Sequence, residues 1–105
     1  MQMKIHLTAA LLIGTAAIPA LAQDAAALHA RSLAATCANC HGTEGRTTDG
    51  SNIPSLAGMP RDYMILQMKA FKEGARQATV MHQLSKGFTE QQIQTVATYF
   101  AALKR

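Results

Sequence analysis

The sequence predicts an all-α domain of three main helices joined by long loops. Apolar residues recur at helical spacing in the middle of the chain and near its C-terminus, and no segment alternates with the period of a strand. The stretches between the helical segments are rich in Gly, Pro, Ser, Thr and Asn, which is typical of loops. A chain of 105 residues has room for one such domain.

The first 22 residues are predicted to be an export signal that precedes the domain. Lys4 comes before an apolar run that extends to Ile18, and Ala20-Leu21-Ala22 has the small residues of a signal peptidase site. The run is too short to be a good membrane span. We therefore expect cleavage after Ala22, a mature domain of residues 23–105 without a membrane span, and a location in the bacterial periplasm.

The first helix is predicted to start at Asp24, whose carboxylate can cap it, and to run to Cys37. Residues 41–59 follow as a predicted loop. A loop of this length is unusual in a small domain unless it wraps around something. The chain has three Phe, two Tyr and no Trp, so its own side chains form a thin core. The long loop and the small number of aromatic side chains together suggest that a bulky apolar group from outside the polypeptide completes the core.

The second helix is predicted over Arg61–Lys72. Pro60 suits the first turn of this helix, and Gly74 is placed to end it. Residues 75–88 are expected to be irregular. This gives the domain its second long loop.

The last helix is predicted to start at Thr89. Gln92 stands three residues later, so the two side chains can form a capping box. Apolar residues then recur at i, i+3, i+4 and i+7 and define the helix face turned to the core: Ile93, Val96, Ala97 and Phe100.

The pattern Cys37-Ala38-Asn39-Cys40-His41 is the strongest functional signal. Two thiols at this spacing can each form a thioether to one haem vinyl group, and the adjacent histidine can bind the iron. A disulfide between the two cysteines would close a very small loop and stabilise little. A thioredoxin-like pair needs a βαβ context, and a zinc site needs two more ligands, for which the mature chain offers His29 and His82. The pattern predicts one covalently attached haem, with His41 as an axial ligand of the iron.

The sixth iron ligand has to come from elsewhere in the chain. Met81 is the preferred residue because it lies in a predicted loop about 40 residues past His41, just before the last helix. Met64 and Met68 have helical spacing and are expected in the core or at the haem edge. His82 is the second choice. The full set of mature candidates is Met59, Met64, Met68, Met81, His29 and His82.

With these features in order, residues 24–105 resemble a class I cytochrome c. The resemblance implies a small fold in which three main helices and long loops wrap one covalently bound haem. It also implies that the carbonyl of Pro54 accepts a hydrogen bond from His41, and that the first and last helices cross. The crossing would bring three residues of the first helix against three of the last: Leu28, Ser32 and Ala35 against Val96, Tyr99 and Phe100.

Within that family, three stretches are most similar to the cytochrome subunit of flavocytochrome c sulfide dehydrogenase, in its single-haem form. They are Cys37 to Thr43, Ile53 to Gly58, and Met81 with Lys86 to Thr89. The resemblance implies an electron-transfer protein without its own catalysis, whose partner is an FAD-containing dehydrogenase subunit that oxidises sulfide. The alternatives are a free shuttle to a terminal oxidase or reductase, and a haem enzyme or gas sensor with an open sixth site.

Charge adds little to this interpretation. The formal net charge is +4, but the basic residues are scattered and form no compact run, so nucleic acid is not an expected partner. Arg46 and Arg61 are candidates to bind the haem propionates. Lys86 is a candidate to steer an acidic redox partner.

Overall fold

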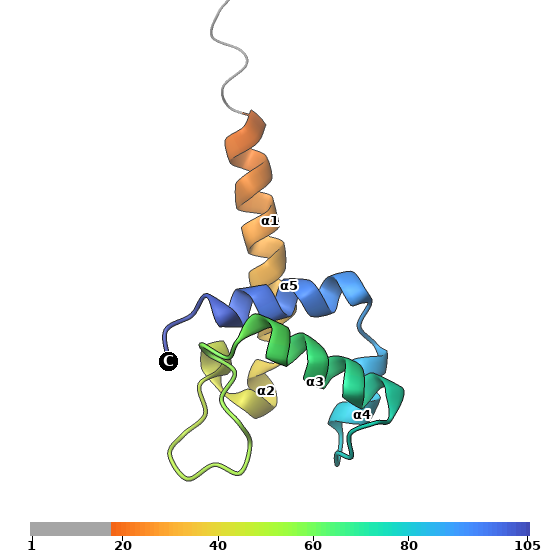
Figure 1. The fold of residues 1–105 in the computed structure, drawn as a ribbon. Helices are drawn as coiled ribbons and strands as arrows, with labels where there is room; N and C mark the ends of the chain where they lie inside the picture. The colour runs from red at the N-terminus through yellow and green to blue at the C-terminus, as the bar shows by residue number, and fades with distance from the viewer. Residues whose placement is uncertain (1–17) are drawn as a thin grey trace, which may run out of the picture.

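The computed structural model describes residues 18–105, a range that contains helices and loops and no strand. The order is α1 (Ile18–Ala35), α2 (Ala38–His41), the 3-10 turn η1 (Thr43–Gly45), α3 (Arg61–Glu73), α4 (Met81–Lys86) and α5 (Glu90–Ala101). α1 projects from the rest of the protein, α5 crosses its lower end, and α3 lies in front of α5 (Figure 1). The predicted all-α class is confirmed, with α1, α3 and α5 as the main helices.

α5 forms as its sequence predicts. The Thr89 hydroxyl accepts a hydrogen bond from the Gln92 amide at 3.1 Å, and the Gln92 side-chain oxygen accepts one from the Thr89 amide at 2.9 Å. This reciprocal cap satisfies two amides at the start of the helix. The apolar face of α5 consists of Ile93, Val96, Ala97 and Phe100, and all four side chains are buried.

α3 also lies where the sequence places it. Gly74 ends it in the left-handed conformation, with φ of 79°, and its amide donates to the carbonyl of Phe71. Pro60 lies one position earlier than expected, since it precedes the first turn with an extended ψ of 131°. There its carbonyl accepts the amide of Met64 at 3.0 Å, so Pro60 still directs the chain into the helix.

The prediction that residues 75–88 are irregular is wrong, because α4 occupies Met81–Lys86. These six residues include neither Gly nor Pro, and Gly87 follows them. Packing on α3 further stabilises this short helix: Ser85 is fully buried, and its hydroxyl donates to the Met68 sulfur at 3.7 Å. A segment this short shows no apolar period, so its helix comes from tertiary contact.

The predicted start of the first helix is wrong as well. α1 begins at Ile18, so Asp24 lies inside it rather than at its cap. Alanine is the strongest helix former, so the alanine-rich stretch before Asp24 continues the helix toward the N-terminus. Pro19 lies in the first turn of α1, where a proline is tolerated. Residues 1–17 of the predicted export signal lie outside the described residues. Of the described helices, none is long and apolar enough to cross a membrane.

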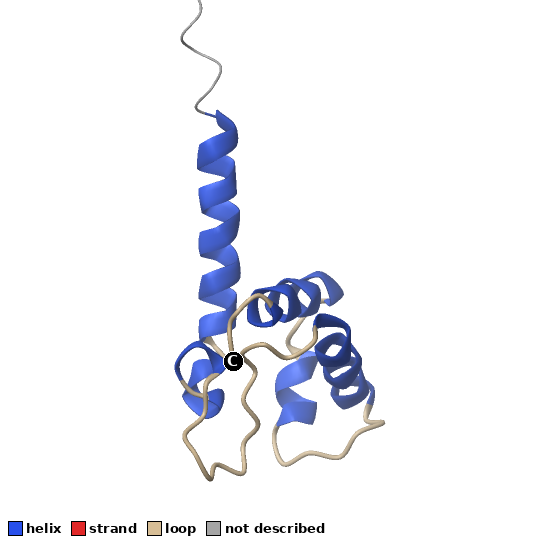
Figure 2. Cartoon of the chain, turned by 60° about the vertical axis from the view of Figure 1, so that its left-hand side comes forward, coloured by secondary structure: helices blue, strands red, loops and turns tan. Residues whose placement is uncertain are grey.

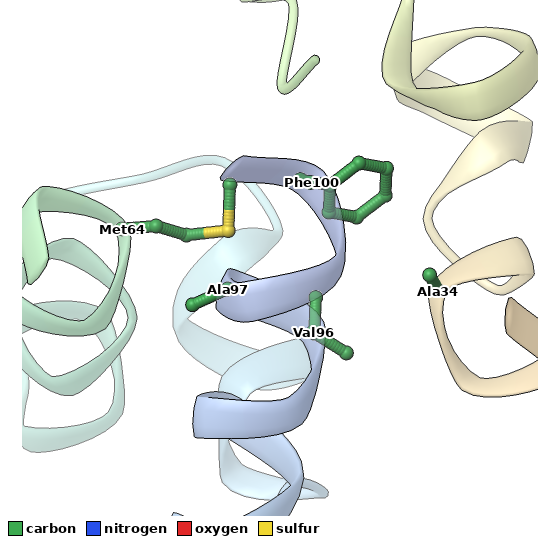
Figure 3. Close-up of a cluster of buried hydrophobic side chains, with 5 residues drawn as sticks. All are labelled: Ala34, Met64, Val96, Ala97 and Phe100. Carbon is green, nitrogen blue, oxygen red and sulfur yellow. The ribbon is translucent and has the colours of Figure 1, made fainter. Parts of the chain in front are cut away.

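The core gathers where α1, α3 and α5 meet. Figure 3 shows Met64 of α3 directed at α5, and Val96 and Phe100 of α5 directed toward Ala34 of α1. The predicted crossing of the first and last helices is present. The predicted contact residues on the first helix are wrong: the last turn of α1 turns Ala34 inward, while Leu28, Ser32 and Ala35 are exposed. Because alanine carries only a methyl group, it lets the two helix backbones approach closely.

Candidate functional site

The three motif residues share one short element. Cys37 precedes α2, Cys40 lies within it, and His41 is its last residue. The amides of Cys40 and His41 both donate to the carbonyl of Cys37, at 3.3 and 3.0 Å, which winds the motif into a single turn. α2 lies at the foot of α1, and α4 lies with α3 on the other side of the protein (Figures 1 and 2).

His41 is nearly buried, with 8% of its surface exposed. Its Nδ1 lies 2.7 Å from the carbonyl oxygen of Pro54. Because a carbonyl can only accept, Nδ1 carries the hydrogen and donates it, and the unprotonated Nε2 is left as the ligand atom. Such a contact fixes the orientation of an imidazole and strengthens it as a donor to a metal.

The loop that carries Pro54 is anchored by the carbonyl of Gly45. This oxygen accepts the Ser55 hydroxyl at 2.7 Å, the Leu56 amide at 2.7 Å and the Ala57 amide at 3.2 Å. Gly45 has φ of 73°, and a β carbon there would lie 2.7 Å from the Phe100 ring. Only glycine fits both conditions. Gly45 was not among the predicted site residues, although its place four residues after the C-x-x-C-H motif is visible in the sequence.

Neither cysteine forms a disulfide. Cys40 is exposed and Cys37 is half-buried. Burial raises the pKa of the Cys37 thiol, and a hydrogen bond with Thr36 offsets part of that rise. Over residues 18–105, no three side chains of His, Cys, Asp or Glu gather into a metal-binding group. Among these residues the two cysteines and His41 therefore lack the four gathered ligands that a zinc site requires.

The candidate sixth ligands differ in how the protein uses them. Met64 is buried in the core, and the sulfur of Met68 accepts the Ser85 hydroxyl, so packing engages both side chains as their helical spacing suggests. Met59 is half-buried against the core cluster. Met81 is half-buried and is the first residue of α4, so it lies on a helix rather than in the expected loop. His29 is exposed on α1, and His82 follows Met81 in α4.

Both candidate propionate partners already have acceptors in the protein. Arg46 donates to Glu44 at 2.8 Å and to the carbonyl of Lys104 at 2.7 Å. Arg61 donates to Asp62 at 2.9 Å and to the Thr98 hydroxyl at 3.0 Å. Each guanidinium has five N–H donors and uses two of them in these bonds, so both arginines keep donors for a cofactor carboxylate.

The exposed apolar side chains fit a large apolar cofactor. Six large apolar side chains are exposed, five of them in the loop after η1, α3 and the α4 region, one on α1 and none on α5: Ile53 (40%), Tyr63 (49%), Leu66 (62%), Val80 (50%), Leu84 (51%) and Leu28 (65%). Exposed apolar side chains that gather into one patch usually mark a binding surface. A haem attached at α2 would supply the apolar body that the thin core lacks, and the donor set has the chemistry to hold it.

The fold and this site define a small helical protein that attaches a haem through C-x-x-C-H. Comparison with known proteins agrees, because residues 26–104 match the cytochrome c family profile. The chain belongs to the cytochrome c family, in class I, and its cofactor is covalently bound haem c.

Several relatives refine this placement. The chain is 40% identical to the cytochrome subunit of sulfide dehydrogenase of Chlorobaculum tepidum, over 70% of this chain and 64% of the relative. It is 38% identical to the thiosulfate dehydrogenase electron acceptor of Thiomonas intermedia, over 68% of this chain and 33% of the relative. The solved structure of Acidithiobacillus ferrooxidans cytochrome c4 matches with a TM-score of 0.59 and 37% identity, over 64% of this chain and 38% of that one. The chain thus spans between a third and two thirds of the length of these relatives.

Proposed function

We propose that this chain is a periplasmic monohaem cytochrome c that accepts electrons from a dehydrogenase of reduced sulfur compounds. In this proposal residues 1–22 are removed on export and residues 23–105 form the working domain. Cys37 and Cys40 bind the haem through thioethers, and His41 and Met81 are the two axial ligands. The observation that carries the proposal is that Cys37, Cys40 and His41 share one helical turn and that the Nδ1 of His41 is bonded to the carbonyl of Pro54.

The chain's own residues account for the expected electron transfer. The bond from His41 to Pro54 keeps the imidazole in one orientation, so its Nε2 meets the iron without rearrangement. The bound haem supplies a single-electron Fe(III)/Fe(II) couple, whose potential a methionine ligand raises. If His41 and Met81 both held the iron, a substrate would find no open coordination site there. This argues for outer-sphere transfer rather than a haem enzyme or gas sensor.

The preferred partner is an FAD-containing subunit that oxidises sulfide. Support comes from the Chlorobaculum relative, which is the cytochrome subunit of sulfide dehydrogenase. The Thiomonas relative favours a second candidate, a free electron carrier that takes electrons from a separate thiosulfate-oxidising enzyme. The same haem site serves both roles, so the two candidates differ only in whether the cytochrome stays bound to its donor.

Gentle purification from the native periplasm tests the proposal. We expect the mature protein to start at Gln23, to keep its haem after acid–acetone extraction, and to show a low-spin spectrum in both redox states. Flavin absorption that co-elutes with the haem and is reduced by sulfide supports the dehydrogenase subunit. A haem protein free of flavin supports the free carrier. A haem lost on extraction, or a high-spin spectrum, contradicts the site.

A further inference from the structure

The segment that carries Met81 is attached to α3 from its beginning. Residues 75–88, which run from the end of α3 to the cap of α5, are called the Met81 segment below. At its start, the amide of Arg76 donates to the Ala70 carbonyl at 3.0 Å, and the guanidinium lies 4.6 Å from the centre of the Phe71 ring. Further along the segment, α4 lies beside α3 (Figures 1 and 2).

The end of the Met81 segment is held by a charged group. The Lys72 ammonium, in the last turn of α3, donates to the carbonyl of Phe88, the last residue of the segment. Both residues are half-buried, and the Phe88 side chain packs against the core cluster. A hydrogen bond from a charged donor is about twice as strong as one between neutral groups, and partial burial strengthens it further. This bond therefore fixes the segment where it joins α5.

α4 depends on such attachments because its own sequence stabilises it weakly. The helix has six residues, and Val80 before it makes no capping hydrogen bond with its side chain. A helix this short is not stable by itself in water. Met81 is the first residue of α4, so the contacts that attach the segment to α3 also set the position of Met81.

Resting on the proposed ligation by Met81, we propose that Lys72 is a positioning residue that keeps this methionine at the iron. Lys72 acts through the Met81 segment rather than on the iron itself. When an external ligand binds, the iron–sulfur bond breaks and a bond from the iron to that ligand forms, without transfer of an electron. The segment has to move away from α3 in this exchange, so the bond from Lys72 to Phe88 opposes it.

Titration of the haem-loaded ferric protein with imidazole tests this inference. Lys72→Met removes the ammonium. Lys69→Met is the matched control, since it removes the same charge about one turn earlier on α3, from a lysine whose partner Glu90 lies in α5. Without the bond to Phe88 the open segment is more populated, and the apparent affinity for imidazole rises in proportion. We expect a rise of about tenfold in Lys72→Met, near the lower end of what a hydrogen bond to a charged group contributes, and the wild-type affinity in Lys69→Met.

The same two substitutions in a Met81→Ala background separate positioning of the methionine from a general effect on the haem site. With no thioether to displace, Lys72→Met should leave the affinity for imidazole unchanged there. Equal affinities in Lys72→Met and Lys69→Met, or a rise that persists without Met81, overturn the inference and leave the proposed ligation by Met81 intact. A wild-type protein without methionine ligation instead overturns the proposed site itself. The two failures are therefore distinguishable.

Discussion

Gly45→Ala tests how the loop that carries Pro54 is fixed. Gly45 has φ of 73°, and a left-handed conformation costs a residue with a β carbon about 1–2 kcal/mol. The new methyl group would also lie 2.7 Å from the Phe100 ring and 2.9 Å from the β carbon of Leu56. The Leu56 carbon cannot retreat easily, because its amide is bonded to the Gly45 carbonyl at 2.7 Å. Overpacking of this kind adds about 1–3 kcal/mol.

The two effects together predict that Gly45→Ala lowers the free energy of unfolding by about 2–5 kcal/mol. For a domain of this size each kcal/mol corresponds to a fall in Tm of about 4–8 °C. The matched control is Gly50→Ala, since Gly50 has φ of 80° and open space where its β carbon would lie. That variant should lose only the conformational part, about 1–2 kcal/mol. Urea unfolding of the haem-loaded proteins, followed by circular dichroism, measures both.

Equal losses of stability in Gly45→Ala and Gly50→Ala would refute the packing part of this reasoning. A second readout connects stability to the site. If the Gly45 carbonyl positions the segment after Pro54, its displacement weakens the bond to His41. The imidazole then becomes a weaker donor and stabilises Fe(III) less, so the reduction potential should rise in Gly45→Ala. The potential of Gly50→Ala should stay at the wild-type value.

Three further outcomes follow from individual contacts. Thr89→Ala removes the cap of α5 and should cost about 1 kcal/mol in urea unfolding, whereas Thr89→Ser should restore most of it. The ion pair of Lys69 and Glu90, 2.8 Å apart, lowers the pKa of Glu90, so its stabilisation is present above the unfolded pKa of a glutamate and is lost as pH falls through the lowered value. Glu90→Gln should flatten the acid side of the Tm profile; an unchanged acid slope would show that the pair contributes nothing. Replacement of Cys37 and Cys40 together by alanine should leave haem that acid–acetone removes, as mass spectrometry would show by a chain without the added haem mass.

The sequence predicted the elements whose signals are local. Thr89 and Gln92 form the capping box, the face from Ile93 to Phe100 is buried, and Gly74 ends α3 in a left-handed conformation. Each of these depends on residues within one or two helical turns. Local chemistry of this kind is readable before the fold is known.

The errors arose where distant contacts decide the structure. α4 forms because Ser85 packs on Met68 of α3, a contact between residues 17 positions apart. On α1, the buried residue is Ala34 rather than its neighbour Ala35, because the crossing with α5 selects the face. An alanine-rich helix has little apolar periodicity of its own, so its sequence does not specify which side meets the core.

The site residues also differ in whether local sequence or distant contacts reveal them. The motif of Cys37, Cys40 and His41 is contiguous, and its chemistry is legible from spacing alone. The role of Pro54 came from the resemblance to a family, since nothing local joins it to a histidine 13 residues away. The role of Gly45 depends on three hydrogen bonds to one carbonyl, which only a three-dimensional structure reveals.

The central claim is that His41 and Met81 bind the iron of a haem attached at α2. The most direct measurement is the red absorption band of methionine-ligated ferric haem, recorded for the wild-type protein, Met81→Ala and Met59→Ala. Met59 is the matched control because, like Met81, it is a half-buried methionine. Ligation by Met81 predicts the band in the wild type and in Met59→Ala and its loss in Met81→Ala. A band that survives in Met81→Ala, or disappears in Met59→Ala, would contradict it.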